Sequence, residues 1–180
     1  WEAGCEARTT PEQIAAYQQQ SRQRLLEVIG GLPERSPLRA RTTGKIQREG
    51  YVVEKVIFES QPQLHVTGLL FLPDAERFKP PYPGVVEPSG HSGNGKAYES
   101  YQSMAALLAL NGMAAFVFDP IDQTERLQYR GERGPYQPDL AGILGHQMVG
   151  VGSILLGRSM ARFLIWDTMR AIDYLQSRPE

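Results

Sequence analysis

The sequence predicts an α/β fold, in which helices cover a mixed, mostly parallel sheet. Three observations support this prediction. Two alternating apolar runs lie at residues 51–58 and 64–72, a strand–helix–strand unit lies at residues 85–118, and a long amphipathic helix follows at residues 153–177. A helix between two parallel strands is the right-handed crossover unit of α/β folds. We expect a helical arm at residues 1–43 and the α/β domain at residues 44–180.

The arm contains one helix with clear ends. Thr10 can cap it, Pro11 suits its first position, Gln13 completes a capping box, and Gly30-Gly31 ends it. Apolar residues share one face at helical spacing: Ile14, Tyr17, Leu25, Val28 and Ile29. The arm is therefore expected to pack on another surface and to carry no chemistry.

The two alternating runs predict a pair of antiparallel strands. Gln61-Pro62-Gln63 separates the runs, and Pro73-Asp74 ends the second one. His65 lies inside the second run. A histidine on a strand is more typical of cross-strand packing than of catalysis, because functional residues concentrate in loops. We therefore assign His65 no chemical role.

The strand–helix–strand unit follows. Val85-Val86 forms a short buried strand, the helix at residues 98–110 ends at Asn111-Gly112, and the strand at residues 114–118 is apolar on both faces. Such a strand is expected where helices cover a parallel sheet on both sides. Four residues are expected to turn toward the sheet from the helix: Tyr101, Met104, Ala105 and Leu108.

The turn inside this unit is the strongest functional signal. Residues 84–96 read GVVEPSGHSGNGK, so a buried strand ends in a glycine-rich turn that contains His91. Backbone N–H groups of such a turn can bind a developing oxyanion, which indicates acyl transfer. The structural alternative is a glycine-rich connection without a ligand. A phosphate-binding P-loop is rejected, because no Ser or Thr follows Lys96 and the preceding glycine is not at P-loop spacing.

The long polar loop that begins at Asp119 leaves the carboxyl end of a strand, where ligands bind in open α/β sheets. We expect Asp122 and Glu125 in this loop to contact a substrate; the alternative is a solvated surface loop.

The helix at residues 153–177 has an apolar stripe made of Leu156, Met160, Phe163, Leu164, Ala171, Ile172 and Leu175. Asp167 lies within this stripe. A carboxylate at such a position is usually paired, so Arg162, Arg170 or a backbone group across the interface is expected to neutralise it.

Composition and charge restrict the partners. The 180 residues carry 19 Lys and Arg against 20 Asp and Glu, a net charge of −1, which offers no basic surface for nucleic acid or an anionic membrane. The apolar runs are shorter than the roughly 20 residues of a membrane span. One cysteine and three histidines predict neither an internal disulfide nor a metal cluster. We expect no nucleic-acid partner, no membrane partner, no metal and no cofactor.

Two segments are similar to the α/β-hydrolase branch that contains acetyl xylan esterase-like proteins. They read GHSGNGKAYESYQSMAALLALNGMAAFVFDPIDQTERLQY and SILLGRSMARFLIWDTMRAIDYLQSRPE. The resemblance spans residues 50–180 and implies the N-terminal part of a three-layer α/β-hydrolase domain. In that family a strand and a GNSGGG-type elbow with the nucleophilic serine follow SRPE, and the acid and histidine of the triad come later. All three are therefore expected beyond Glu180, and the chain is expected to be a fragment.

The resemblance also implies roles for individual residues. In such proteins this turn forms half of the oxyanion hole, which implies the backbone N–H of His91 and, second to it, that of Ser92. The His91 side chain is not the triad histidine, because that residue follows the nucleophile in the chain. Hydrolases usually read His-Gly where Ser89-Gly90 stands here, but Gly90 and Gly93 are expected to permit the required dihedrals. His146 is expected to line the cleft and to contact the substrate.

We therefore predict a fragment of a serine carboxylic-ester hydrolase that supplies the oxyanion-hole turn and is inactive without its triad. The resemblance implies an ester substrate such as an acetylated carbohydrate, the C-terminal part of the domain as a partner, and a secreted or periplasmic location. The alternative is a non-catalytic α/β-hydrolase-like module that binds or assembles without turnover.

Overall fold

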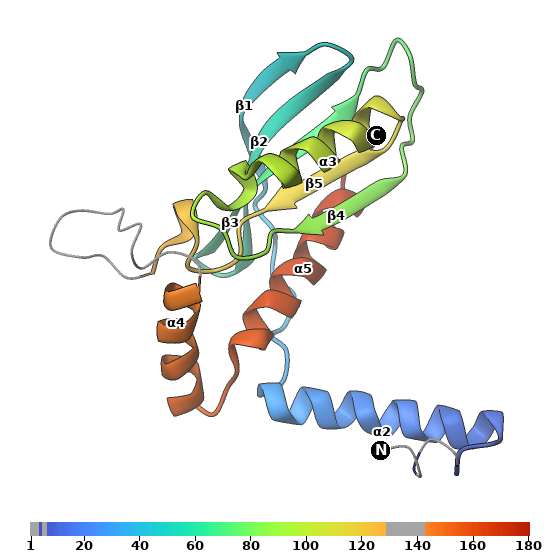
Figure 1. The fold of residues 1–180 in the computed structure, drawn as a ribbon, viewed down its shortest axis with the longest axis vertical. Coiled ribbons are helices and arrows are strands. Elements are labelled where there is room, and N and C mark those ends of the chain that lie inside the picture. The colour runs from blue at the N-terminus through green and yellow to red at the C-terminus, as the bar shows by residue number, and fades with distance from the viewer. Residues whose placement is uncertain (1–3, 5–6, 129–142) are drawn as a thin grey trace, which may run out of the picture.

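The computed structural model of the chain describes residues 4, 7–128 and 143–180 (Figure 1). Its centre is a five-stranded sheet in the order β1-β2-β3-β5-β4. The strands are β1 (Arg41–Arg48), β2 (Tyr51–Gln61), β3 (Leu64–Pro73), β4 (Gly84–Pro88) and β5 (Ala114–Phe118). The pairs β1–β2, β2–β3 and β3–β5 are antiparallel, and β4 and β5 are parallel.

Helices cover both faces of the sheet (Figure 1). Helix α3 (Glu99–Leu110) lies on one face and α5 (Met160–Gln176) on the other. Two apolar cores result. The α3 side contains Val53, Phe71, Ala105, Ala109, Ala115 and Val117, and the α5 side contains Val56, Phe58, Val66, Leu70, Ala114, Phe116, Phe118, Ala171 and Tyr174. Because alternate residues of β5 enter the two cores, the whole strand is buried. The predicted mixed sheet flanked by helices and the crossover unit are confirmed, but within the described sheet most strand pairs are antiparallel, contrary to the expected mostly parallel sheet.

Helix α2 (Pro11–Ile29) has the predicted ends. The Thr10 side chain accepts a hydrogen bond from the Gln13 N–H, the Gln13 side chain completes the capping box, and Gly30 ends the helix with a left-handed φ of 80°. Ile29 is the buried residue of this helix. The rest of α2 projects away from the sheet (Figure 1), so its apolar face is exposed to solvent.

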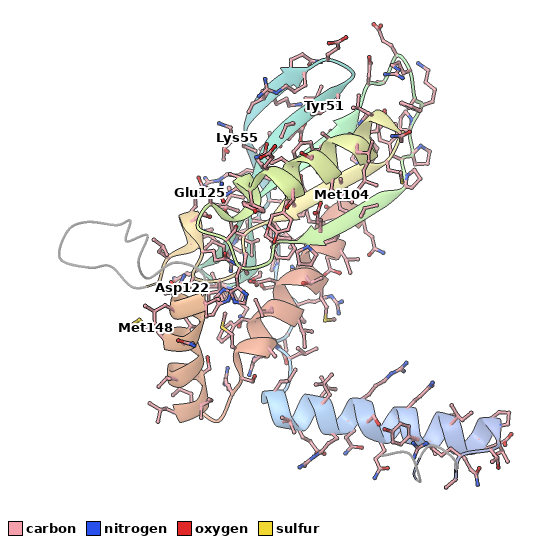
Figure 2. All side chains as sticks on the ribbon, viewed as in Figure 1. Tyr51, Lys55, Met104, Asp122, Glu125 and Met148 are labelled. Atoms are coloured by element: carbon pink, nitrogen blue, oxygen red, sulfur yellow. The ribbon has the colours of Figure 1, made fainter. Side chains whose placement is uncertain are left out.

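Strand β1 was not predicted. It reads RTTGKIQR and is mostly exposed, so it lacks the apolar alternation that marks β2 and β3. It begins at Arg41, and the expected domain boundary at residue 43 falls within it. On α3, Ala105 is buried and Tyr101 and Leu108 pack against the same core, but Met104 is half exposed, contrary to the prediction (Figure 2).

The single helix predicted at residues 153–177 is wrong. Helix α4 (Ile143–Leu155) ends first, and α5 begins at Met160 after a bend of 106°. Gly157 adopts a left-handed φ of 66°, and the Ser159 side chain caps α5 by accepting from the Ala161 N–H. The buried face of α5 consists of Arg162, Trp166, Asp167, Arg170, Ala171 and Tyr174, whereas Leu156 and Ile172 of the predicted stripe are exposed.

Across the described ranges, no individual helix has the length and apolar composition needed to cross a membrane. Helices α4 and α5 meet that requirement only when they are counted together across their bend.

Candidate functional site

The glycine-rich turn, defined as residues 89–97, connects β4 to α3 at the carboxyl ends of the two parallel strands (Figure 1). Its two ends are bonded to the end of β5. The Ser89 N–H donates to the Phe118 carbonyl at 3.4 Å, and the Lys96 N–H donates to Oδ1 of Asp119 at 2.8 Å. The turn is therefore fixed where ligands bind in open α/β sheets.

The middle of the turn is held by Gln123, a fully buried residue of the loop after β5. The Ser92 N–H donates to Oε1 of Gln123 at 2.9 Å, and Nε2 of Gln123 donates to the Gly90 carbonyl at 3.2 Å. The Gly90 N–H donates to the Tyr101 hydroxyl at 2.9 Å. Within residues 7–128 and 143–180, the His91 N–H has no such acceptor. Of three successive N–H groups, the outer two are thus engaged and the central one is not.

The glycines of the turn have different roles from those expected. Neither Gly90 nor Gly93 has a positive φ; the glycine that does is Gly95, at 49°. A Cβ at Gly95 would lie 2.2 Å from Oδ1 of Asp119, and one at Gly90 would lie 2.6 Å from the Tyr101 hydroxyl. A Cβ at Gly93 would meet no atom within 4 Å. Gly90 is therefore required by the closeness of Tyr101, and the dihedral argument for Gly90 and Gly93 is wrong.

The structure brings His91 together with His146 of α4. Nε2 of His91 lies 2.7 Å from Nδ1 of His146, and Nε2 of His146 lies 2.7 Å from the Ile121 carbonyl. A carbonyl can only accept, so Nε2 of His146 carries the hydrogen and, in the neutral ring, Nδ1 accepts from His91. Burial lowers the pKa of His146, and His91 adds to this effect, while the bond to Ile121 opposes it. Both ring nitrogens of His146 are engaged.

A buried ion pair lies on the other side of the turn. Nζ of Lys96 contacts Oδ2 of Asp119, which is fully buried, and lies 2.6 Å from Oε2 of Glu125. The Thr67 hydroxyl also donates to Oδ2 of Asp119, at 3.0 Å. The hydrogen bond from Lys96 lowers the pKa of Glu125. Sequence reasoning missed this cluster; its one signal was an acidic residue directly after a fully apolar strand.

Asp122 and Glu125, the two predicted substrate contacts, lie in different environments. Asp122 is 1% exposed, and its Oδ1 accepts from the Gln128 N–H at 2.6 Å, so it stabilises its own loop. The Glu125 side chain is 65% exposed and lies in the short helix η2 (Thr124–Arg126). The part of the predicted loop at residues 129–142 lies outside the described residues.

Asp167 is buried and paired, as expected, but the partner differs from the two predicted arginines. NH1 of Arg126 lies 2.8 Å from Oδ2 of Asp167 and donates to the Asp119 carbonyl at 2.7 Å. Nε of Arg126 donates to the His65 carbonyl at 2.8 Å. Arg162 instead donates to the Gly30 carbonyl, and Arg170 pairs with Asp173. Arg126 therefore fixes the loop that carries Gln123 to both β3 and α5.

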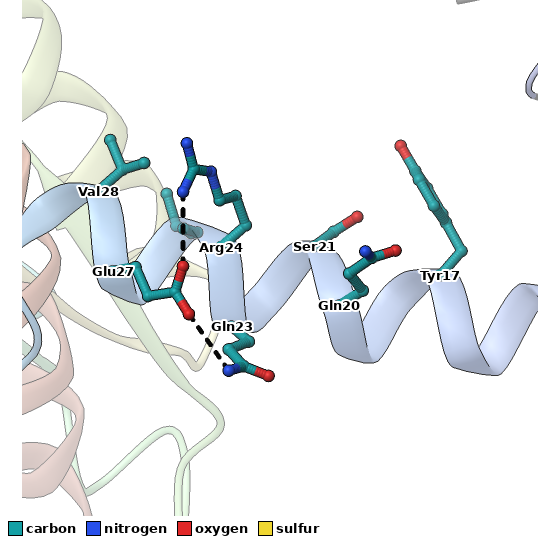
Figure 3. A pocket seen from close by; sticks show the side chains of 8 residues that line it. Tyr17, Gln20, Ser21, Gln23, Arg24, Glu27 and Val28 are labelled. Atoms are coloured by element: carbon teal, nitrogen blue, oxygen red, sulfur yellow. Dashed lines mark hydrogen bonds and ion pairs between the residues drawn. The ribbon is translucent and has the colours of Figure 1, made fainter.

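Two grooves lie near the glycine-rich turn and the edge of β4, and a further hollow lies along α2. A groove of about 690 Å³ lies beside the turn and is lined by Gly93, Asn94, Lys96 and Glu125, and by residues of β1 to β3 that include Lys55 (Figure 2). A second groove of about 610 Å³ lies between the outer edge of β4 and α5. A third, of about 740 Å³, runs along α2 beside Tyr17, Arg24 and Val28, away from the turn (Figure 3).

No group of three or more His, Cys, Asp and Glu side chains that could hold a metal ion occurs in the part of the chain that the structure describes.

Comparison with protein-family models finds no match, and comparison with curated proteins finds no relative. Solved structures, however, share the fold. A candidate acetyl xylan esterase from Bacteroides fragilis aligns with a TM-score of 0.72 and 21% identity over 94% of this chain and 45% of its own. The acetyl xylan esterase from Paenibacillus sp. R4 aligns with a TM-score of 0.55 and 24% identity over 81% of this chain and 43% of its own. A glucuronoyl esterase from Solibacter usitatus aligns with a TM-score of 0.55 and 14% identity over 95% of this chain and 50% of its own.

The chain spans less than half the length of the first two of these proteins. The likeness confirms the predicted resemblance at the level of fold. The five-stranded mixed sheet flanked by helices is shared with about half of the length of these esterase structures.

Proposed function

We propose that this chain is the N-terminal part of a serine carboxylic-ester hydrolase and that the backbone N–H of His91 is one donor of its oxyanion hole. One observation carries the proposal: the N–H groups of Gly90 and Ser92 are bonded to Tyr101 and Gln123, while that of His91 is left without an acceptor among the described residues. Ser92, the second predicted donor, already donates to Gln123. The fold shared with esterases supports the reaction class.

The chemistry assigned to the turn is electrostatic. When a serine attacks an ester carbonyl, negative charge develops on the carbonyl oxygen, and a fixed N–H stabilises this charge more than it stabilises the neutral ester. In α/β-hydrolases the second donor is the N–H of the residue after the nucleophile. The turn would therefore supply half of the hole, and the remaining catalytic groups would come from beyond Glu180.

The outer edge of β4 fits the position of the next strand. Strand β4 is the last strand of the described sheet, and a groove separates its edge from α5. The Tyr82 N–H donates to the Glu180 carbonyl at 2.7 Å, so residue 180 lies beside the start of β4. A strand that continued from there along the edge would run parallel to β4 and end beside the turn, where the nucleophile is required.

The substrate that we propose is the ester of an acetylated carbohydrate. Support comes from the neighbours in fold, two of which are named as acetyl xylan esterases. We assign the alcohol part of the ester to the groove beside the turn, where the exposed carboxylate of Glu125 can accept hydrogen bonds from hydroxyl groups. His146 and Asp122 would shape the cleft through their bonds to His91 and Gln128.

Turnover of p-nitrophenyl acetate by the full-length protein tests this proposal. We expect saturable hydrolysis that a serine-directed phosphonate abolishes, and no hydrolysis by the 180-residue chain alone, because the nucleophile and its base are absent. Phosphonate-sensitive turnover by the chain alone would contradict the assignment of the triad. A folded full-length protein without any turnover would favour the binding module instead.

A further inference from the structure

We propose that Gln123 is a positioning residue, which orients the peptide bond between Gly90 and His91 so that the His91 N–H faces the reacting ester. This inference rests on the proposed function and adds to it a residue that acts through the turn. Neither the glycine-rich motif nor the family resemblance indicated Gln123.

The direction of the His91 N–H follows from the geometry of the peptide bond between Gly90 and His91. In a planar trans peptide the C=O and N–H point in opposite directions, and the cis peptide that the described structure contains is Pro80-Pro81. The Gly90 carbonyl and the His91 N–H belong to the same peptide. Because Nε2 of Gln123 binds the Gly90 carbonyl at 3.2 Å, the His91 N–H must point away from Gln123. The second bond, from Ser92 to Oε1 of Gln123, fixes the next peptide in the same way.

The amide of Gln123 is itself held rigidly. The side chain is fully buried. The backbone of Gln123 is also bonded on both sides: its backbone N–H donates to the Pro120 carbonyl at 3.3 Å, and its backbone carbonyl accepts from the Arg126 N–H at 2.8 Å. Arg126 in turn pairs with Asp167 of α5. A donor that is fixed before the reaction needs no reorganisation when charge develops, which is the condition for effective oxyanion stabilisation.

The ends of the turn do not depend on Gln123. Ser89 is bonded to the end of β5, the Gly90 N–H to Tyr101, and the Lys96 N–H to Asp119. Loss of the Gln123 amide should therefore leave the turn in place and free the 90–91 peptide to rotate. This separates a positioning role from a purely structural one.

The experiment compares Gln123→Met and Gln123→Glu in the full-length protein. Methionine has a similar length and makes neither bond. An ionised glutamate keeps the acceptor for the Ser92 N–H but has no donor for the Gly90 carbonyl, so this variant is measured at a pH high enough to ionise the carboxyl. Gln47→Met makes the same chemical change at an exposed position of β1 and is the matched control. We measure kcat and KM for p-nitrophenyl acetate, thermal melting, and hydrogen exchange at the Ser92 amide.

We expect Gln123→Met to lower kcat about tenfold to a hundredfold with KM nearly unchanged, because the bond to His91 is made mainly in the transition state. Gln123→Glu should lower kcat to a similar extent while the Ser92 amide stays protected from exchange. In Gln123→Met that amide should exchange faster. Gln47→Met should match the wild type in every measurement.

Normal kcat in a folded Gln123→Met protein, with an active wild type, would overturn this inference and leave the proposed function standing. Normal kcat in a folded Gln123→Glu protein would also overturn the inference and leave the proposed function standing. This variant therefore tests the positioning role even if Gln123→Met does not fold. A loss of kcat that only follows a fall in melting temperature would show a structural role and also overturn it. A wild type without phosphonate-sensitive turnover would overturn the proposed function and this inference together.

Discussion

At the scale of single residues, the site is defined by which backbone groups are already bonded. The Gly90 N–H donates to Tyr101 and the Ser92 N–H to Gln123, whereas the His91 N–H has no acceptor among the described residues and is the one that we assign to a ligand. The residue pattern predicted a glycine-rich turn with free backbone groups after a strand, and the family resemblance then implied His91 within it. The resemblance ranked His91 above Ser92 but offered no physical reason, because the reason that the structure supplies is the bond from the Ser92 N–H to Gln123, 31 residues away.

Substitution of Gly90 should lower kcat of the full-length protein far more than substitution of Gly93. In Gly90→Val the new Cβ would lie 2.6 Å from the Tyr101 hydroxyl, so either Tyr101 or the turn must shift and their hydrogen bond is disturbed. We expect kcat to fall about a hundredfold, since the loss of one oxyanion donor costs about 3 to 4 kcal/mol and displacement costs somewhat less. In Gly93→Val the Cβ has open space but faces the groove assigned to the alcohol, so KM should rise while kcat changes less than about twofold. Equal losses in the two variants, with folding verified by circular dichroism, would exclude this mechanism.

His146 should make stability depend on pH. Burial lowers its pKa below the ordinary value of 6.5, while His91, Asp122 and Arg126 face it. At a pH between the lowered pKa of the folded state and 6.5, the unfolded chain binds more protons than the folded one. The stability that neutral His146 contributes is therefore lost as the pH falls below 6.5. The difference in melting temperature between about pH 7.5 and pH 5.5 should therefore be smaller in His146→Gln than in the wild type. An identical difference in both proteins would show that His146 does not titrate in this way.

At the scale of elements, one buried ion pair connects the loop after β5 to α5. The side chains of Arg126 and Asp167 are 2% and 0% exposed, so neither charge is solvated. The expected partners of Asp167 lay on its own helix, where spacing can be read from the sequence. The actual partner comes from a loop 41 residues earlier, and only the packing of α5 against the sheet brings the two together.

Arg126→Met should lower the free energy of unfolding by about 3 to 5 kcal/mol, because it leaves the buried carboxylate of Asp167 without a counter-charge. The double variant Arg126→Met, Asp167→Leu should recover much of this loss. Arg24→Met is the control, since its ion pair with Glu27 is exposed and should contribute less than about 1 kcal/mol. Urea denaturation measures all three. A double variant less stable than Arg126→Met would contradict the unpaired-charge explanation.

The element boundaries that were missed have identifiable causes. The apolar spacing of residues 153–177 continues across the break at Gly157, so periodicity alone predicted one helix, although Gly157 followed by Ser159 is a helix end and a new cap. Strand β1 is polar and exposed and therefore has no alternation to detect. The ends of α2, which depend on local capping residues, were predicted correctly.

At the scale of the whole molecule, the described sheet has an outer edge at β4 beside an apolar groove that includes Val86, Ile172 and Leu175. An unpaired edge strand is a template for association with another chain. We therefore expect the 180-residue chain to self-associate as its concentration rises, and the full-length protein to remain free of this association. Sedimentation velocity over a concentration series measures it. A chain that stays monomeric up to about 100 µM would show that the edge is not available for pairing.

The overall architecture was largely predictable, because the crossover unit and the apolar strand β5 are local patterns. The resemblance implied a three-layer arrangement, but the sheet order and the layer that each helix occupies were not predicted, because they depend on contacts between elements distant in the sequence. The expected packing of α2 on another surface is not seen in the described structure, where its apolar face is exposed, because helical spacing shows that a face is apolar but not what it contacts.

The most direct test of the central claim is a crystal structure of the full-length protein with a phosphonate bound covalently to its nucleophile. We expect a serine adduct beside the carboxyl end of β4, with the phosphonyl oxygen about 2.7 to 3.1 Å from the His91 nitrogen. An adduct whose oxygen is bound by other donors, while the His91 N–H points away from it, would contradict the assignment of this turn to the oxyanion hole.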